Sequence, residues 1–157
     1  MTWIEGSHQR NFEVSVPLDE VADFMSDPER LRHCLVDLER YEKVDDQTYR
    51  WVLGEVGAKN ITFQADYTVR YERKGQEVVW KSEGEGTTRT EGRALLSEAG
   101  PEKTKVDYEE TLANDLPVPK LARRVFRPIV KREVKKAVDQ FLDNVIAYLN
   151  EGHHRDE

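Results

Sequence analysis

Residues 117–150 read PVPKLARRVFRPIVKREVKKAVDQFLDNVIAYLN, and this stretch decides the fold. Apolar residues recur in it at intervals of three and four, which predicts a long amphipathic helix. Its apolar stripe consists of Leu121, Val125, Ile129, Val130, Val134, Val138, Phe141, Leu142, Val145 and Leu149. Pro128 has no backbone N–H to donate, so we expect it to kink the helix or divide it into two segments.

The first half of this predicted helix is strongly basic, although the chain carries a net charge of −7. Eight basic residues and one acidic residue give positions 120–136 a formal charge of +7. Five of the basic residues form a stripe opposite the apolar one: Lys120, Arg124, Arg127, Lys131 and Lys135. The favoured interpretation is a solvated face that pairs with an acidic sheet. The alternatives are contact with anionic lipid headgroups and docking of an acidic protein partner.

The chain before this helix changes its period from 3.6 to 2, which predicts strands. Alternating segments lie at 36–45, 47–55, 59–73, 76–83, 87–97 and 103–113. An earlier strand is expected at 8–16, followed by two short helices at 18–26 and 28–34. Tight turns between the later strands imply antiparallel neighbours. The predicted architecture is therefore an α+β fold, in which a curved seven-stranded antiparallel sheet wraps around the long C-terminal helix.

Length and composition set the outer limits of this interpretation. At 157 residues we expect one domain, at 1–150, and a charged tail at 151–157 in which His153 and His154 have no third metal ligand. The glycines match no nucleotide-binding motif, so no cofactor and no metal are expected. The negative net charge argues against general nucleic-acid binding. The sequence has no secretory signal and no apolar run of membrane-spanning length, so the expected location is cytoplasmic.

Two segments resemble a known superfamily. FEVSVPLDEVADFMSDPERLRHCL (12–35) and VDLERYEKVDDQTYRW (36–51) are similar to the first strand, helix pair and next two strands of the START/polyketide cyclase-like superfamily, SRPBCC, which has the helix-grip fold. In element order the resemblance covers nearly the whole chain. Members include aromatase/cyclases, lipid and sterol carriers and the G subunit of carbon monoxide dehydrogenase, and the last is the most similar at DPERL. The motif is structural, so the resemblance implies a fold and an internal cavity but does not choose among these functions.

In such a fold the inward face of the sheet and the helix would enclose a ligand. The expected ligand-binding residues are Trp51, Phe63, Tyr67, Trp80, Thr90, Tyr108, Glu110, Phe126 and Ile129. By the same alternation, the inward face of the predicted strands (the inward phase) also contains Tyr49, Tyr71, Ser82 and Thr88. Aromatic rings with polar tips suit a mostly apolar ligand that carries a few oxygens. The alternative is that these side chains only fill the core.

Glu110 is the unusual residue in this phase and the one weak candidate for a catalytic group. A carboxylate that faces an apolar cavity has a raised pKa, unless a cation such as Arg10 compensates it. It could then bind a ligand hydroxyl or act as a general acid or base. A slip of one residue in the strand register would instead turn it outward.

The leading functional prediction is binding or transport, without catalysis, of a small hydrophobic ligand that is lipid-, polyketide- or aromatic-like. The first alternative is a cyclase- or hydratase-type enzyme that uses Glu110 with Tyr67 or Tyr108. The second is a recruitment module that docks an acidic partner or a membrane through Lys120, Arg124, Arg127 and Lys131. His33 and Cys34 are not a catalytic pair, because adjacent residues on a helix do not face each other; we expect a structural cysteine.

Overall fold

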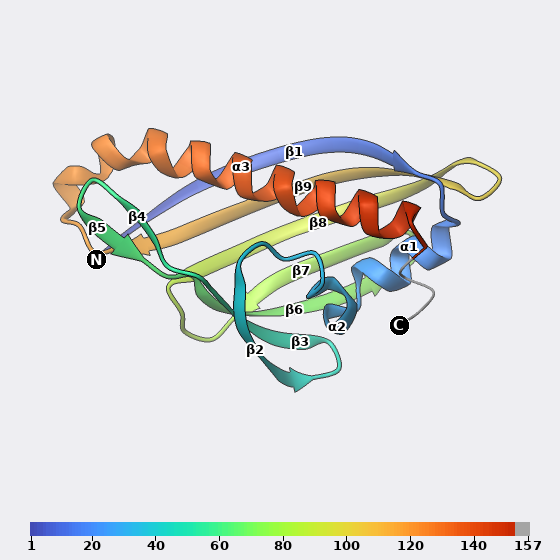
Figure 1. Cartoon of the computed structure of the whole chain (residues 1–157), viewed down its shortest axis with the longest axis horizontal. Coiled ribbons are helices and arrows are strands. Elements are labelled where there is room, and N and C mark those ends of the chain that lie inside the picture. Colours follow the sequence, from blue (N-terminus) through green and yellow to red (C-terminus); the bar gives the residue numbers. More distant parts are fainter. Residues whose placement is uncertain (153–157) are drawn as a thin grey trace.

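The computed structural model describes residues 1–152, so most of the predicted charged tail, with His153 and His154, lies outside the described residues. Figure 1 shows the arrangement of the elements. The helices are α1 (Leu18–Met25), α2 (Pro28–Leu31), the 3₁₀ turn η1 (Lys120–Ala122) and α3 (Arg123–Asn150). The strands are β1 (Thr2–Val14), β2 (Leu38–Asp45), β3 (Thr48–Leu53), β4 (Val56–Ala58), β5 (Ile61–Phe63), β6 (Asp66–Lys74), β7 (Glu77–Glu83), β8 (Thr88–Gly100) and β9 (Lys103–Leu116).

Seven of the strands form one antiparallel sheet, in the order β1-β9-β8-β7-β6-β3-β2. The alternating inward side chains of this sheet and the buried stripe of α3 form the core. In Figure 1, α3 runs along the sheet beside β1, α1 lies near the C-terminal end of α3, and α2 lies near β3. The α+β helix-grip architecture predicted from the sequence is therefore confirmed.

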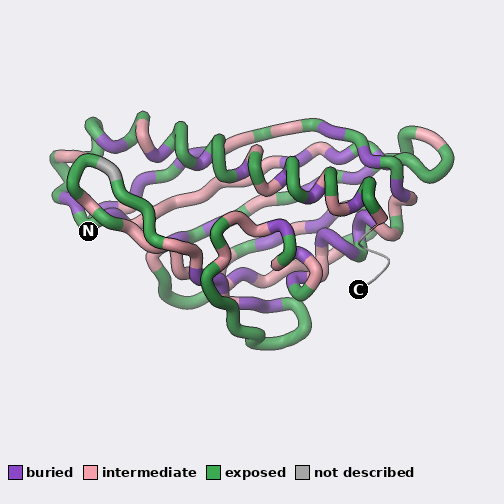
Figure 2. Tube along the Cα trace, in the orientation of Figure 1, coloured by how far each residue is buried: buried purple, intermediate pink, exposed green. Residues whose placement is uncertain are grey.

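Helix α3 is continuous from Arg123 to Asn150 with Pro128 inside it, so of the two predicted effects of this proline, division into two segments does not occur. Its buried face is Phe126, Val130, Val134, Val138, Leu142, Val145 and Leu149, and the turns facing away from the sheet are exposed in Figure 2. The predicted stripe is also wrong at its start, because Leu121 is 95% exposed and Val125 is 53% exposed. Leu121 lies in the tighter 3₁₀ turn, and Val125 is about 100° around the helix from Phe126.

The basic stripe is solvated, as the favoured interpretation states, but its predicted pairing with the sheet is wrong. Lys120, Arg124, Arg127 and Lys131 are all exposed, and none of these four forms an ion pair with any residue in the range 1–152. Lys135 pairs with Asp139 of the same helix, at 3.0 Å. No helix among the described residues is both long enough and apolar enough to cross a membrane.

The segment predicted as one strand at 59–73 forms parts of two separate elements. A separate hairpin, β4–β5, comes first, and β6 of the main sheet begins only at Asp66. Lys59 and Asn60 at the hairpin tip both have positive φ, 49° and 67°. Two such residues define the two-residue turn that reverses a hairpin. Lys-Asn is not the usual Asn-Gly signature of this turn. The break between β5 and β6 lies at residues 64 and 65, and the alternation of Ile61, Phe63, Ala65 and Tyr67 continues across it, so periodicity alone did not reveal the break.

One long side of α3 is fixed against β1. A Cβ atom on Gly6 would lie 3.1 Å from both Lys131 Cα and Val134 Cβ, so the two backbones approach closely there. Further along, His8 Nε2 and Asp139 Oδ1 are 2.8 Å apart. Arg10 joins both Asp139 and Asp143. The other side of the first half of α3 faces the β4–β5 hairpin, as Figure 1 shows.

Candidate functional site

Two neighbouring chambers lie between the sheet and α3. The inner chamber, near α1 and α2, has a volume of about 120 Å³. The outer chamber, between the β4–β5 hairpin and the first half of α3, has a volume of about 620 Å³. The chambers share five lining residues: Val36, Leu53, Tyr67, Leu112 and Ala137. The two chambers are here called the channel, and their walls are mostly apolar, which is typical of small-molecule sites.

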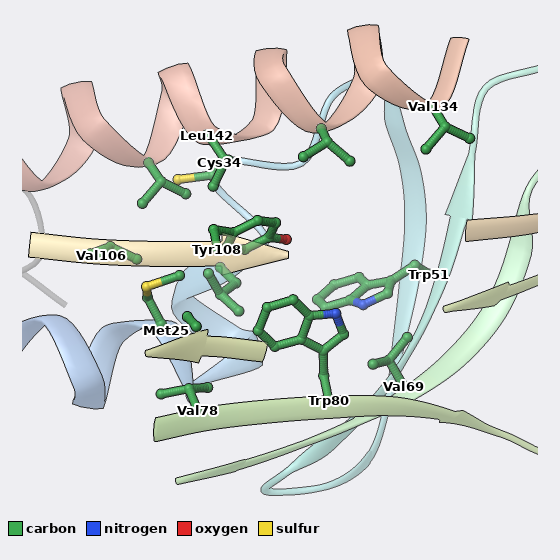
Figure 3. Close-up of a cluster of buried hydrophobic side chains, with 14 of the residues drawn as sticks. Met25, Cys34, Trp51, Val69, Val78, Trp80, Val106, Tyr108, Val134 and Leu142 are labelled. Carbon is green, nitrogen blue, oxygen red and sulfur yellow. The ribbon is translucent and has the colours of Figure 1, made fainter. Parts of the chain in front are cut away.

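The inner chamber has one polar centre, Glu110. Its Oε2 accepts hydrogen bonds from Trp80 Nε1, at 3.2 Å, and from the Thr90 hydroxyl. Its Oε1 accepts one from the Tyr108 hydroxyl, at 2.7 Å. Figure 3 shows Trp80 and Tyr108 within the cluster of buried side chains between the sheet and α3. The prediction that Glu110 faces inward is therefore confirmed, and the register slip is excluded.

The surroundings of Glu110 disfavour its charge. Burial raises the pKa of this carboxyl above its ordinary value, and the three hydrogen bonds oppose that rise without cancelling it. Arg10 does not compensate the charge, because it pairs with Asp139 and Asp143. Burial and the nearby Glu110 also raise the pKa of Tyr67 and Tyr108, so both phenols stay protonated near neutral pH. The chamber therefore presents a carboxyl of raised pKa among neutral hydroxyls.

We expect Glu110→Gln to stabilise the folded protein at neutral pH. Because the folded-state pKa of Glu110 is raised, its ionisation costs folding free energy at pH values above that pKa. The cost shrinks as the pH falls below the folded-state pKa. It is absent below the unfolded-state pKa, where the carboxyl is protonated in both states. Gln keeps the shape, and the Thr90 and Tyr108 hydroxyls can rotate to accept from its amide.

The measurement is thermal unfolding of both proteins between pH 4 and pH 8. Each kcal/mol gained corresponds to a rise of roughly 2–4 °C in Tm for a domain of this size. The gain should shrink as the pH is lowered. A gain that is the same at every pH would contradict an ionisation cost at Glu110.

The outer chamber contains a second polar site, which is smaller than the Glu110 cluster of the inner chamber. Thr88 Oγ1 donates to Asn114 Oδ1 at 2.9 Å, and both residues line the chamber. The opposite wall comes from α3, which contributes Phe126 and Ile129, and Phe63 of the hairpin completes the apolar lining. These three side chains were predicted to face the ligand, and the structure places them around one opening.

The remaining predicted site residues divide between the channel and the core. Tyr67, Trp80, Thr90, Tyr108 and Glu110 line the inner chamber, as does Tyr71. Trp51 lines neither chamber; it is fully buried and donates its indole N–H to Tyr71 Oη, at 3.1 Å. Tyr49 is also buried in the core, where its hydroxyl donates to Glu29.

Sequence reasoning missed several lining residues, above all Asn114. The predicted strand at 103–113 stops before Asn114, whereas β9 continues to Leu116 and pairs there with Thr2. The signal was available, since the inward phase of Val106, Tyr108 and Glu110 continues without a break to position 116. Val36 and Ala137 carried no signal, because only the tertiary fold brings them to the channel.

Cys34 is a structural residue, as expected. It is fully buried, and burial raises the pKa of its thiol to about 12. The nucleophilic thiolate is therefore disfavoured. The neighbouring His33 ring stacks on Tyr148 of α3, with ring centroids 5.6 Å apart.

Comparison with solved structures gives the same fold. A START superfamily protein from Mycobacterium smegmatis matches with a TM-score of 0.70 at 13% identity, over 92% of this chain and 97% of that one. The Zhui aromatase/cyclase from Streptomyces sp. R1128 matches with a TM-score of 0.66 at 12% identity, over 98% and 96%. A protein from Thermus thermophilus matches with a TM-score of 0.65 at 22% identity, over 91% and 94%. At these identities the likeness concerns the fold alone, and that fold is the helix-grip fold expected from the sequence.

Sequence comparison is more specific. No curated protein matches this chain. The family model for the G subunit of carbon monoxide dehydrogenase (CoxG) matches residues 11–148. This match extends from β1 through the whole sheet and almost to the end of α3, and so includes both chambers and the Glu110 cluster. The chain therefore belongs to the CoxG family.

Proposed function

We propose that this protein binds and carries a small hydrophobic molecule with at least one oxygen function. The observation that supports this most strongly is the composition of the inner chamber, in which apolar and aromatic walls surround a polar cluster centred on Glu110. A purely apolar ligand would not offset the cost of a buried carboxyl. A strongly polar ligand would lose its own hydration against walls that offer few hydrogen bonds in return.

Native mass spectrometry of the gently purified protein, followed by solvent extraction, tests the proposal. We expect a bound molecule that is released intact and that competes with a fluorescent hydrophobic probe. Incubation with the extracted molecule also separates a carrier from an enzyme. A ligand of unchanged mass and unchanged chromatographic retention supports carriage, whereas a change in either that Glu110→Gln abolishes supports the cyclase- or hydratase-type alternative. A protein that is empty and displaces no probe would refute ligand binding.

A docking surface beside the channel opening is a second candidate function. Lys120, Arg124, Arg127 and Lys131 have no ion-pair partner among residues 1–152. Leu121 lies among them with its side chain almost wholly in solvent, at 95% exposure. Basic groups around a protruding apolar side chain match an anionic lipid surface better than an acidic protein, because the leucine can enter the headgroup region.

Reversing two of these charges should abolish binding to anionic vesicles. Each basic residue near such a surface contributes about 1 kcal/mol, so Arg124→Glu with Arg127→Glu should lower the affinity at least roughly 30-fold. The measurement is co-sedimentation with vesicles of phosphatidylcholine, with and without phosphatidylglycerol, at low and high salt. The matched control, Lys81→Glu with Lys105→Glu, makes the same charge change on the outer face of the sheet. Equal loss in both variants would show a net-charge effect without a docking site.

A further inference from the structure

We propose that the channel recognises an elongated ligand with oxygen functions at both ends, a hydroxyl at Glu110 and a carbonyl or carboxylate at Asn114. This inference rests on the proposed function and names the ligand class. The two polar groups, here called the inner station (Glu110) and the outer station (Asn114), lie on the same strand, β9, and face the same channel.

The inner station has one acceptor position left. The two oxygens of an ionised carboxylate offer about four acceptor positions. Three positions are used by protein donors: Trp80 and Thr90 donate to Oε2, and Tyr108 donates to Oε1. The remaining position is on Oε1. The hydroxyls of Tyr67 and Tyr71 also line the inner chamber, but neither donates to Glu110 among the described residues. This position therefore stays open to a donor, which a ligand hydroxyl supplies.

The outer station has the opposite requirement. Asn114 Oδ1 accepts the Thr88 hydroxyl, and its amide Nδ2 has no hydrogen-bond partner among the described residues. Two N–H donors therefore remain for a ligand acceptor. The charge of the lining does not decide between a neutral and an anionic acceptor at this end of the ligand. The outer chamber includes two acidic and two basic residues: Asp37, Glu133, Arg132 and Lys136. A carbonyl and a carboxylate both satisfy the amide.

The spacing of the stations sets the length of the ligand. Glu110 and Asn114 are four residues apart, which corresponds to about 13 Å along an antiparallel strand. An extended chain advances roughly 1.2 Å per bond, so the two oxygens should be about ten bonds apart. Leu112 lies between the stations and lines both chambers, so the middle of the ligand should be apolar.

A set of ten-carbon acids tests this assignment by displacement of a fluorescent hydrophobic probe. We expect 10-hydroxydecanoic acid to bind at least about tenfold more tightly than its isomer 3-hydroxydecanoic acid, which has the same atoms but no hydroxyl at the inner end. Asn114→Leu removes the outer amide at nearly constant volume. This variant should bind 10-hydroxydecanoic acid no better than wild-type protein binds 1-decanol, and its affinity for 1-decanol should be unchanged. Glu110→Gln, which replaces the charged acceptor by an amide, should narrow the preference between the isomers.

The outcomes separate this inference from the function on which it rests. Equal affinity for the two isomers would overturn the two-station assignment and leave hydrophobic ligand binding intact. An unaltered affinity of Asn114→Leu for the hydroxy acid would overturn the outer station. If none of the ten-carbon compounds displaces the probe while the protein purifies with another bound molecule, the ligand class is wrong. If the protein also purifies empty, the proposed function is refuted as well.

Discussion

Replacing Leu112 by tryptophan is expected to lower the affinity for the natural ligand by about 100-fold or more, a loss of roughly 2.7 kcal/mol. Leu112 projects from β9 at the point where the two chambers meet, and it lines both of them. An indole at this position would occupy the apolar middle of the channel and separate Glu110 from the opening. Because the side chain borders open space, the larger residue should fit at a modest cost in stability.

The control is Leu95→Trp, the same substitution on the outer face of β8. Leu95 is 44% exposed, and its neighbours across the sheet are Glu77 and Asp107, both away from the channel. Ligand content after purification and probe displacement should be normal in this variant. If Leu112→Trp still purifies with its ligand at the wild-type level, the ligand does not lie in the channel between α3 and the sheet.

The accuracy of the sequence predictions followed the strength of the alternation between buried and exposed residues. Strand β8 illustrates the favourable case, because Thr88, Thr90, Ala94 and Leu96 were all assigned to the inward face and all are buried. The inward position of Glu110 came from the same argument, since a polar residue in an otherwise apolar phase is visible in the sequence. Periodicity therefore predicted the wall of the site, including its one carboxyl.

What periodicity could not predict is the outline of the cavity within the core. Trp51 and Trp80 share the inward phase, yet Trp80 borders the inner chamber and Trp51 is buried without bordering it. That difference depends on where α3 and the short helices cover the sheet, which no single strand encodes. The unpaired basic residues at the start of α3 are a second example. Their positions were clear, but the absence of acidic partners for Arg124 and Arg127 within 1–152 required the fold.

The Glu110 cluster also depends on a glycine in the neighbouring strand. Gly92 pairs with Trp80 on β7 and with Glu110 on β9, so the three residues lie side by side across the sheet. Because position 92 has no side chain, the Trp80 ring can lie over it and bring Nε1 to within 3.2 Å of Glu110 Oε2. A Cβ atom on Gly92 would lie 2.5 Å from Trp80 Cζ2 and 2.6 Å from the Glu109 carbonyl oxygen. Both contacts are far inside van der Waals distance.

We therefore expect Gly92→Ala to destabilise the protein by about 3 kcal/mol or more, since overpacking of a buried site forces the ring or the strand to move. For a domain of this size that corresponds to a fall in Tm of roughly 6–12 °C. The measurement is thermal unfolding beside Gly75→Ala, where no atom lies within 4 Å of the new Cβ and the cost comes only from a positive φ of 65°. That control should lose about 1 kcal/mol.

Trp80→Leu provides the test of the cause. If the clash with the indole dominates, the two substitutions together should cost clearly less than the sum of their separate effects, because the leucine leaves room for the new methyl group. The contact with the Glu109 carbonyl would remain, so recovery should be partial. If the stability losses of the two substitutions simply add, the proposal that Gly92 makes room for the Trp80 ring is contradicted. The folded fraction of Gly92→Ala should also bind hydroxylated ligands weakly, since a displaced indole can no longer hold the Glu110 carboxylate in place.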